Sequence, residues 1–152
     1  MANKPHRPPE LKLSNDSAIE LGKVPDVPRF LRVIGSAFPG AFLHLEGSSI
    51  DSKILECVGP SLIAEPVHAK RGTWWPRSER LVAVIDESLM NCLSDAAEHL
   101  ATPEVADHLL VSTQSEVLLE VYDLHDAQAR MSSVLPPAVR EQLLSVTVRP
   151  AR

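Results

Sequence analysis

The chain has 152 residues, of which 44% are hydrophobic and 23% are charged, and its net charge at pH 7 is −5. This composition is that of one globular domain and excludes an intrinsically disordered chain. The first residues contain no apolar signal segment, and no apolar run approaches the ~20 residues of a membrane helix. We therefore expect a cytoplasmic protein without a membrane span.

The chain contains two cysteines, Cys57 and Cys92. Each lies inside an apolar pattern of helical period, where a cysteine commonly behaves as a small buried hydrophobe. Disulfide bonds are rare in the reducing cytosol. We therefore expect two buried free thiols and no disulfide.

Residues 1–23 are rich in proline and show no clean hydrophobic period. Proline lacks a backbone N–H and opposes regular structure. We expect a flexible proline-rich tail here, with a short edge strand at residues 11–13. A single globular domain is expected to follow over residues 24–152.

The first regular element of that domain is a predicted helix. Asp26 is a typical N-cap residue, and apolar residues recur at helical spacing over residues 27–34. Gly35 together with Pro39 is expected to end the helix. Residues 41–46 lie between two glycines and are too few for a stable helix, so they predict a strand.

The next elements alternate between helix and strand. Ser49 is expected to cap a second helix that runs to residue 58. The aliphatic residues 81–85 predict a strand. Asp86 is expected to begin a third helix, because an acid in the first turn interacts favourably with the helix dipole, and Pro103 is expected to stop it.

Two strand-like runs, residues 107–113 and 116–124, flank the dipeptide Gln114-Ser115 and predict a hairpin. A last helix is expected after Pro136. Helices interspersed with short strands predict an α+β fold, with a small mixed or antiparallel sheet of about four to five strands packed with about four helices.

Charge is distributed unevenly along the chain. Residues 81–129 hold ten Asp and Glu and no Lys or Arg, so this stretch carries −10 and the remaining residues carry +5. Such asymmetry can steer a basic partner toward the protein. The alternative is that these acids only solvate helix and strand surfaces, or face bases that the fold brings from elsewhere.

The histidines predict neither a metal site nor a cofactor site. His99, His108 and His125 lie near acids, but no His-x-x-x-His or Cys-x-x-Cys spacing is present. Structural roles are the simpler interpretation. His108 is expected on the inward side of the hairpin, and His99 near a helix C-terminus, where a cation is favoured.

No catalytic motif is complete either. The run Gly47-Ser48-Ser49 follows a predicted strand but lacks the second glycine of a nucleophile elbow. Residues 70–77 interleave bases with Trp74 and Trp75, a pattern that can stack on single-stranded nucleic acid. In an acidic protein we expect them at the edge of the core, with no nucleic-acid binding. We therefore expect a protein that is not an enzyme.

The outward face of the hairpin is the predicted contact surface. If Gln114 and Ser115 form the turn, paired residue numbers sum to 229, and alternation places apolar, aromatic and acidic side chains together on one face. The alternative is that a helix covers this face too. The predicted partner-binding residues are Asp107, Leu109, Val111, Glu116, Leu118, Glu120, Tyr122, Asp123 and Asp126.

Three stretches carry a resemblance to a known group. They are Phe-Pro-Gly-Ala-Phe-Leu-His-Leu-Glu-Gly-Ser-Ser at 38–49, Glu-Val-Ala-Asp-His-Leu-Leu at 104–110 with Glu-Val-Tyr-Asp at 120–123, and Met-Ser-Ser-Val-Leu-Pro at 131–136. They resemble small bacterial proteins of immunity-protein type, which neutralise secreted toxins inside the producing cell. The resemblance covers residues 38–146 and implies a non-enzymatic α+β binding domain.

Together these features predict a cytoplasmic immunity or antitoxin-like protein. Its partner is expected to be a basic toxin effector, with a nuclease as the first candidate, because a carboxylate-rich surface can occupy a cleft built for phosphates. The alternative is a small non-catalytic regulatory or housekeeping module, in one form a homodimer, whose acidic face is only solvated.

Overall fold

The computed structural model describes residues 10–11, 13, 17–63, 68–69, 79–126 and 128–149. Within these residues six strands form one antiparallel sheet in the order β2-β8-β7-β6-β3-β5. The strands are β2 (Ala18–Gly22), β3 (Phe42–Gly47), β5 (Glu79–Val84), β6 (His108–Ser112), β7 (Val117–Tyr122) and β8 (Gln128–Ser132). Two further short strands, β1 (Glu10–Leu11) and β4 (His68–Ala69), pair in parallel with each other.

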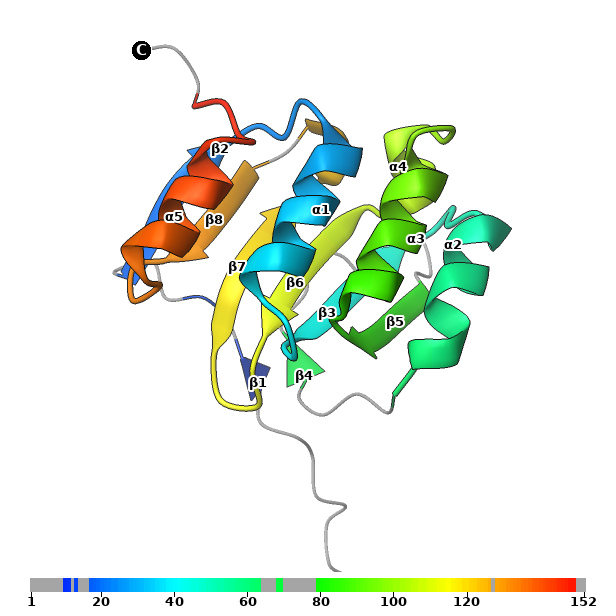
Figure 1. Cartoon of the computed structure of the whole chain (residues 1–152), viewed down its shortest axis with the longest axis horizontal. Helices are drawn as coiled ribbons and strands as arrows, with labels where there is room; N and C mark the ends of the chain where they lie inside the picture. The colour runs from blue at the N-terminus through cyan, green and yellow to red at the C-terminus, as the bar shows by residue number, and fades with distance from the viewer. Residues whose placement is uncertain are drawn as a thin grey trace, which may run out of the picture.

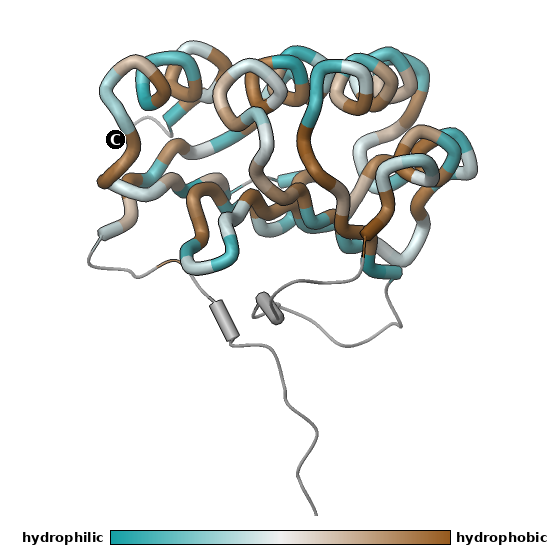
Figure 2. Tube along the Cα trace, turned by 60° about the horizontal axis from the view of Figure 1, so that its bottom comes forward, coloured by the Kyte–Doolittle hydropathy of each residue, from teal (hydrophilic) through white to brown (hydrophobic). Residues whose placement is uncertain are grey.

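The α-helices lie on one side of the sheet. Figure 1 shows α5, α1 and α3 in front of the strands and α2 to the right of β5, and Figure 2 shows the helices above the sheet. The described helices are α1 (Val27–Ala37), α2 (Ser52–Val58), α3 (Glu87–Ala97), α4 (Thr102–Val105) and α5 (Pro137–Leu144), with 3-10 turns η2 (Gly59–Ser61) and η3 (Leu124–Asp126). The α+β class is confirmed, with more strands and helices than expected.

The core lies between these two layers. Across the middle of the sheet, Leu43 pairs with Val111, Val111 with Leu119, and Leu119 with Met131. Directly paired residues share a face, and these four side chains are at most 1% exposed. Burying one such side chain stabilises the fold by roughly 1.5–3 kcal/mol, so this row holds the sheet against the helices.

Gly35 lies inside α1 and has a packing role, and the helix ends directly before Pro39. Helix α1 continues through it to Ala37, starting from the predicted N-cap Asp26. A Cβ atom at Gly35 would lie 2.8 Å from Cβ of Met90 in α3, closer than side chains normally approach. The absent side chain therefore allows α1 and α3 to pack closely.

Three local expectations were wrong. The N-cap of α2 is Asp51, whose carboxylate accepts from the N–H of Lys53, and not Ser49. Strand β8 was not predicted at all. Strand β2 is the edge strand of the sheet, so residues 18–22 belong to the folded sheet and not to a tail that ends at residue 23.

The expectation of two free thiols was also wrong. Cys57 in α2 and Cys92 in α3 form a disulfide, with their Cα atoms 5.6 Å apart. Cys57 is half-buried and Cys92 is exposed. Packing of α2 beside α3 brings together two cysteines that are 35 residues apart, and local periodicity contains no signal of that packing.

Among the described residues, no helix is long and apolar enough to cross a membrane.

We predict that reducing this disulfide lowers the free energy of unfolding. Cross-linking across 35 residues restricts the unfolded chain and is worth about 4 kcal/mol in the chain-entropy account. Urea unfolding with and without a reductant measures the difference. The variant Cys57→Ser/Cys92→Ser is the control: it should match the reduced protein and be indifferent to the reductant. Equal midpoints for oxidised and reduced wild type would contradict the prediction.

Candidate functional site

The predicted contact face of the hairpin is not a single surface. Near the turn the pairing is as expected, since Ser112 pairs with Val117. The next pair is Val111 with Leu119, so Leu118 is an extra residue on β7. A bulge of this kind shifts all pairing beyond it by one residue. Every pair after Leu118 therefore differs from the predicted register.

The bulge separates the residues that were predicted to lie together. Leu109 and Val111 face the helices and are 1% and 0% exposed. Glu120 faces the other side of the sheet and is 2% exposed, and Tyr122 is half-buried on that same side. Leu118 is buried in the core. The predicted mixed patch is wrong, because its apolar members are core residues and Glu120 is not accessible.

The four remaining predicted residues lie at the two ends of the hairpin. Glu116 is exposed in the turn between β6 and β7. Asp107, Asp123 and Asp126 lie at the opposite end, where β6 begins and β7 ends. Trp74 and Trp75 lie outside the described residues.

Several acids of the 81–129 stretch act as local caps. Asp86 accepts from the N–H of Leu89 at 2.7 Å and begins α3 as expected. Glu104 accepts from the N–H of Ala101 at 2.9 Å. These carboxylates satisfy backbone donors that a helix start leaves without intrahelical partners. These two carboxylates therefore bind backbone groups of their own helix starts.

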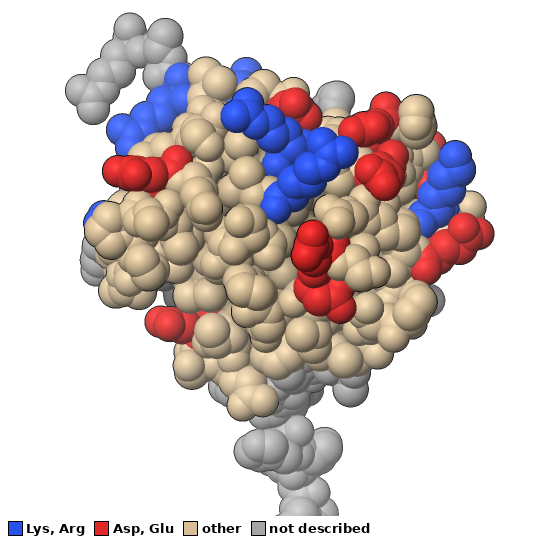
Figure 3. Space-filling model, in the orientation of Figure 1, with Lys and Arg blue, Asp and Glu red and all other residues tan. Residues whose placement is uncertain are grey.

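Other acids of the stretch pair with bases from outside it. Arg32 in α1 lies 2.9 Å from Glu98 and 3.5 Å from Asp95. Arg130 in β8 pairs with Glu120. Figure 3 shows acids and bases interspersed over the helical side of the molecule. The stretch that carries −10 therefore does not form one continuous acidic face on this side.

The sheet face away from the helices carries a buried polar cluster. The carboxylate of Glu120 accepts from the guanidinium of Arg130, which is 30% exposed. Tyr122 is hydrogen-bonded to Glu120, and its ring contacts His108 edge-on, with the ring centroids 5.7 Å apart. Burial is the largest cause that raises the pKa of Tyr122, followed by the charge of Glu120.

His108 has a structural role different from the one predicted. It lies on this polar face, half-buried, and its Nδ1 accepts from the N–H of Asp123 at 2.9 Å. Asp123 has φ +53°, in the left-handed region that few residues other than glycine adopt. His108 therefore stabilises the sharp turn that leads from β7 into η3 and so positions Asp126.

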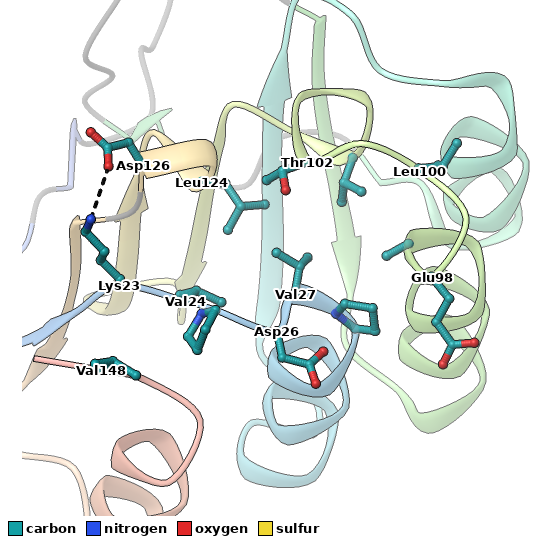
Figure 4. A pocket seen from close by; sticks show the side chains of 14 residues that line it. Lys23, Val24, Asp26, Val27, Glu98, Leu100, Thr102, Leu124, Asp126 and Val148 are labelled. Atoms are coloured by element: carbon teal, nitrogen blue, oxygen red, sulfur yellow. Dashed lines mark ion pairs between the residues drawn. The ribbon is translucent and has the colours of Figure 1, made fainter.

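Asp126 lies on the rim of a pocket at this end of the molecule, which we call the end pocket. Its volume is about 880 Å³. The floor is apolar, with Val24, Val27 and Leu124 among its lining residues. Figure 4 shows these side chains between the start of α1, the end of α3 and the segment around Asp126.

Three carboxylates from separate elements border the end pocket: Asp26 before α1, Glu98 after α3, and Asp126 in η3. Lys23 lies beside Asp126, with its Nζ 3.8 Å from Oδ1 of that carboxylate. The C-terminus of α3 places partial negative charge at this rim and the N-terminus of α1 places partial positive charge there, so the two helix ends offset each other and the carboxylates carry the net charge. The pocket therefore combines apolar area with an acidic rim, an arrangement that suits a cationic group attached to an apolar one.

No group of three or more potential metal ligands is present among the described residues. Of the nine predicted partner-binding residues, Asp126 alone lines the end pocket. Sequence reasoning missed Asp26 and Glu98, because one was assigned only as a cap and the other only as part of a charge count.

Comparison of the chain with protein-family models, with curated proteins and with solved structures finds no match.

We predict that Glu120→Lys lowers the melting temperature markedly. The variant places two cations, the new lysine and Arg130, side by side where the wild type has a buried ion pair. Breaking a buried pair costs roughly 3–5 kcal/mol, less where one partner is partly solvated. Thermal unfolding followed by circular dichroism tests this. Glu116→Lys, an exposed site on the same hairpin, should melt close to wild type. Equal melting of all three proteins would contradict a buried Glu120.

We also predict that Tyr122 ionises above its ordinary pKa of 10.0. Since the folded state holds this proton more tightly than the unfolded state, its contribution to stability is complete below pH 10.0 and is lost as the pH rises further. Tyr122 is the only tyrosine, so tyrosinate absorbance reports it alone. Glu120→Gln should lower the midpoint, because it removes a charge that opposes ionisation. Titration at the ordinary pKa in the folded wild type would refute the prediction.

Proposed function

We propose that this chain is a non-catalytic binding protein that holds a basic, partly apolar segment of a partner protein in the end pocket. The observation that carries the proposal is the placement of Asp26, Glu98 and Asp126 around one apolar floor. Apolar area provides affinity, and carboxylates at the rim select a cation and speed its approach.

Of the three rim carboxylates, Glu98 pairs with Arg32 at 2.9 Å and Asp26 accepts from the N–H of Arg29. Binding of a cation therefore centres on Asp126. Lys23 and Asp126 are 67% and 74% exposed and 3.8 Å apart. Exposed pairs of this kind contribute about 0–1 kcal/mol. An incoming arginine or lysine can therefore replace Lys23 beside Asp126 at little cost, and the pocket remains receptive although its acids have neighbours.

We further propose a basic toxin effector as the class of partner, with the chain as an antitoxin-like protein. Proteins that act on nucleic acids expose arginines and lysines to phosphates. A carboxylate-rimmed pocket can engage one of those side chains and block access to it. The resemblance over residues 38–146 supports the same class.

A second candidate is a small regulatory module whose acids serve structure and solvation. The observation that favours it is the local use of the acids in residues 81–129, where Asp86 and Glu104 cap backbone groups and Glu120 pairs with Arg130. For this candidate the end pocket has no preference for cations. The binding experiment below therefore separates the two.

We predict that a short synthetic peptide carrying arginine and leucine binds saturably, and that Asp126→Arg weakens its binding by tenfold or more, ~1.4 kcal/mol. The substitution replaces attraction at the pocket rim by repulsion. Fluorescence anisotropy of the labelled peptide measures the dissociation constant. Raising the salt from low concentration to ~0.5 M should weaken binding, because screening shortens the reach of charge.

The matched control is Glu116→Arg, which changes the net charge equally at an exposed site on the opposite end of the hairpin. It should bind the peptide nearly as well as wild type. A peptide with glutamate in place of arginine should not bind. Equal losses for both variants would reduce the effect to net charge, and no binding by wild type would leave only the regulatory candidate.

A further inference from the structure

A small hollow lies between helix α5 and the sheet, and we call it the α5 hollow. Its volume is about 270 Å³, close to the lower limit of about 300 Å³ for small-molecule sites. Ile19 in β2 and Met131 in β8 line it from the sheet, where they are directly paired and therefore share the helical face. Figure 1 shows α5 in front of these two strands. A ligand that fits this hollow must be small.

One face of α5 forms the opposite wall of the hollow. Residues three and four positions apart lie on the same side of a helix, and the lining residues of α5 have this spacing: Pro137, Arg140, Glu141 and Leu144. Leu143 and Val146 are 0% and 4% exposed and fix the end of α5 on the core. The position of this wall is therefore set by core packing.

The chain beyond α5 returns to the sheet and brings a second arginine to the hollow. The N–H of Lys23 donates to the C=O of Val148, and the N–H of Val148 donates to the C=O of Lys23, both at 2.8 Å. These two hydrogen bonds fix the returning segment directly after the end of β2. The next residue, Arg149, lines the hollow together with Arg140.

Neither arginine of the hollow has an anionic partner among the described residues. Arg140 and Arg149 form no ion pair there, and the Nε of Arg140 is buried without a hydrogen-bond partner. A buried donor without an acceptor is energetically costly. Guanidinium groups present several N–H donors in one plane, which suits the oxygens of a carboxylate or a phosphate. A bound anion would supply the acceptor that these two side chains lack.

The charges and apolar surface of the hollow select the kind of anion. Two arginines and Glu141 give the lining residues a net charge of +1, since two positive charges and one negative charge are present. A single negative charge is therefore balanced, whereas a doubly charged group also meets the repulsion of Glu141. Ile19 is half-buried and Leu144 is 38% exposed, so apolar area remains for the rest of a ligand.

We propose that the α5 hollow binds a small apolar carboxylate. The N–H groups of Arg140 and Arg149 donate to the carboxylate oxygens, and the apolar body of the ligand lies against Ile19 and Leu144. No residue of the described chain lines both this hollow and the end pocket. The site is therefore independent of the end pocket and of the partner proposed for it.

The test is a calorimetric titration of the full chain with octanoate. Wild type should bind it saturably in a one-to-one ratio, whereas octanol and octylamine, which lack the carboxylate, should not bind at the same concentrations. Arg140→Gln and Arg149→Gln should each weaken octanoate binding tenfold or more, because each removes one guanidinium. Glu141→Gln should strengthen binding, because it removes the negative charge that opposes the anion.

The matched control is Arg29→Gln, which removes the same charge from an exposed residue of α1 that does not line the hollow. It should bind octanoate as wild type does. Inorganic phosphate, which lacks an apolar body, should bind at least tenfold more weakly than octanoate. No octanoate binding by wild type, equal losses in Arg29→Gln and Arg140→Gln, or phosphate binding as tight as that of octanoate would each overturn the proposal.

Amide chemical shifts locate the site in the wild type without any substitution. Octanoate should shift the amide signals of Ile19, Glu141 and Leu144 and leave those of the β6–β7 turn unchanged. Circular dichroism checks that each variant folds, and if an arginine variant does not fold, the location of the shifts decides. Shifts centred elsewhere, for example at the end pocket, would show that the α5 hollow is not the site.

Discussion

In β7, Leu118 is an extra residue between the pair Ser112–Val117 and the pair Val111–Leu119. Because side chains alternate along a strand, this one residue determines which side of the sheet everything after it faces. With the bulge, Leu119 enters the core and the carboxylate of Glu120 lies beside Arg130 on the opposite side. Without it, Glu120 would face the helices. The pairing of β7 with β8 carries the same alternation to the next strand.

The two sides of the sheet therefore have different chemistry. The helical side is closed by aliphatic side chains, and the close contact of Gly35 with Met90 brings α1 and α3 together. The other side holds paired polar groups, of which Glu120 with Arg130 is the most buried ion pair described. A buried charge is costly unless it is paired, so this side maintains its arrangement through specific partners.

The end pocket results from the ends of several elements meeting at one place. Asp26 begins α1, Glu98 follows α3, and Asp126 follows the left-handed turn at Asp123. Each of the three carboxylates has a local partner: Asp26 caps α1, Glu98 pairs with Arg32, and Asp126 pairs with Lys23. That all three line one pocket with an apolar floor is a property of the packing.

The sequence by itself determined the local features of this protein: the starts of α1 and α3 at Asp26 and Asp86, the strand β3, the hairpin turn and the α+β class. Caps and hydrophobic periods act between near neighbours and can be read in one dimension. Only the tertiary structure decided the bulge at Leu118, the strand β8, whose inward residues are few, and the disulfide. It also decided which acids have partners, because Glu120 meets Arg130, and Asp95 and Glu98 meet Arg32, only once the layers pack. Of the predicted contact residues, Asp126 reached the pocket and Leu109 and Val111 became core, since strand register depends on pairing between segments and not on composition.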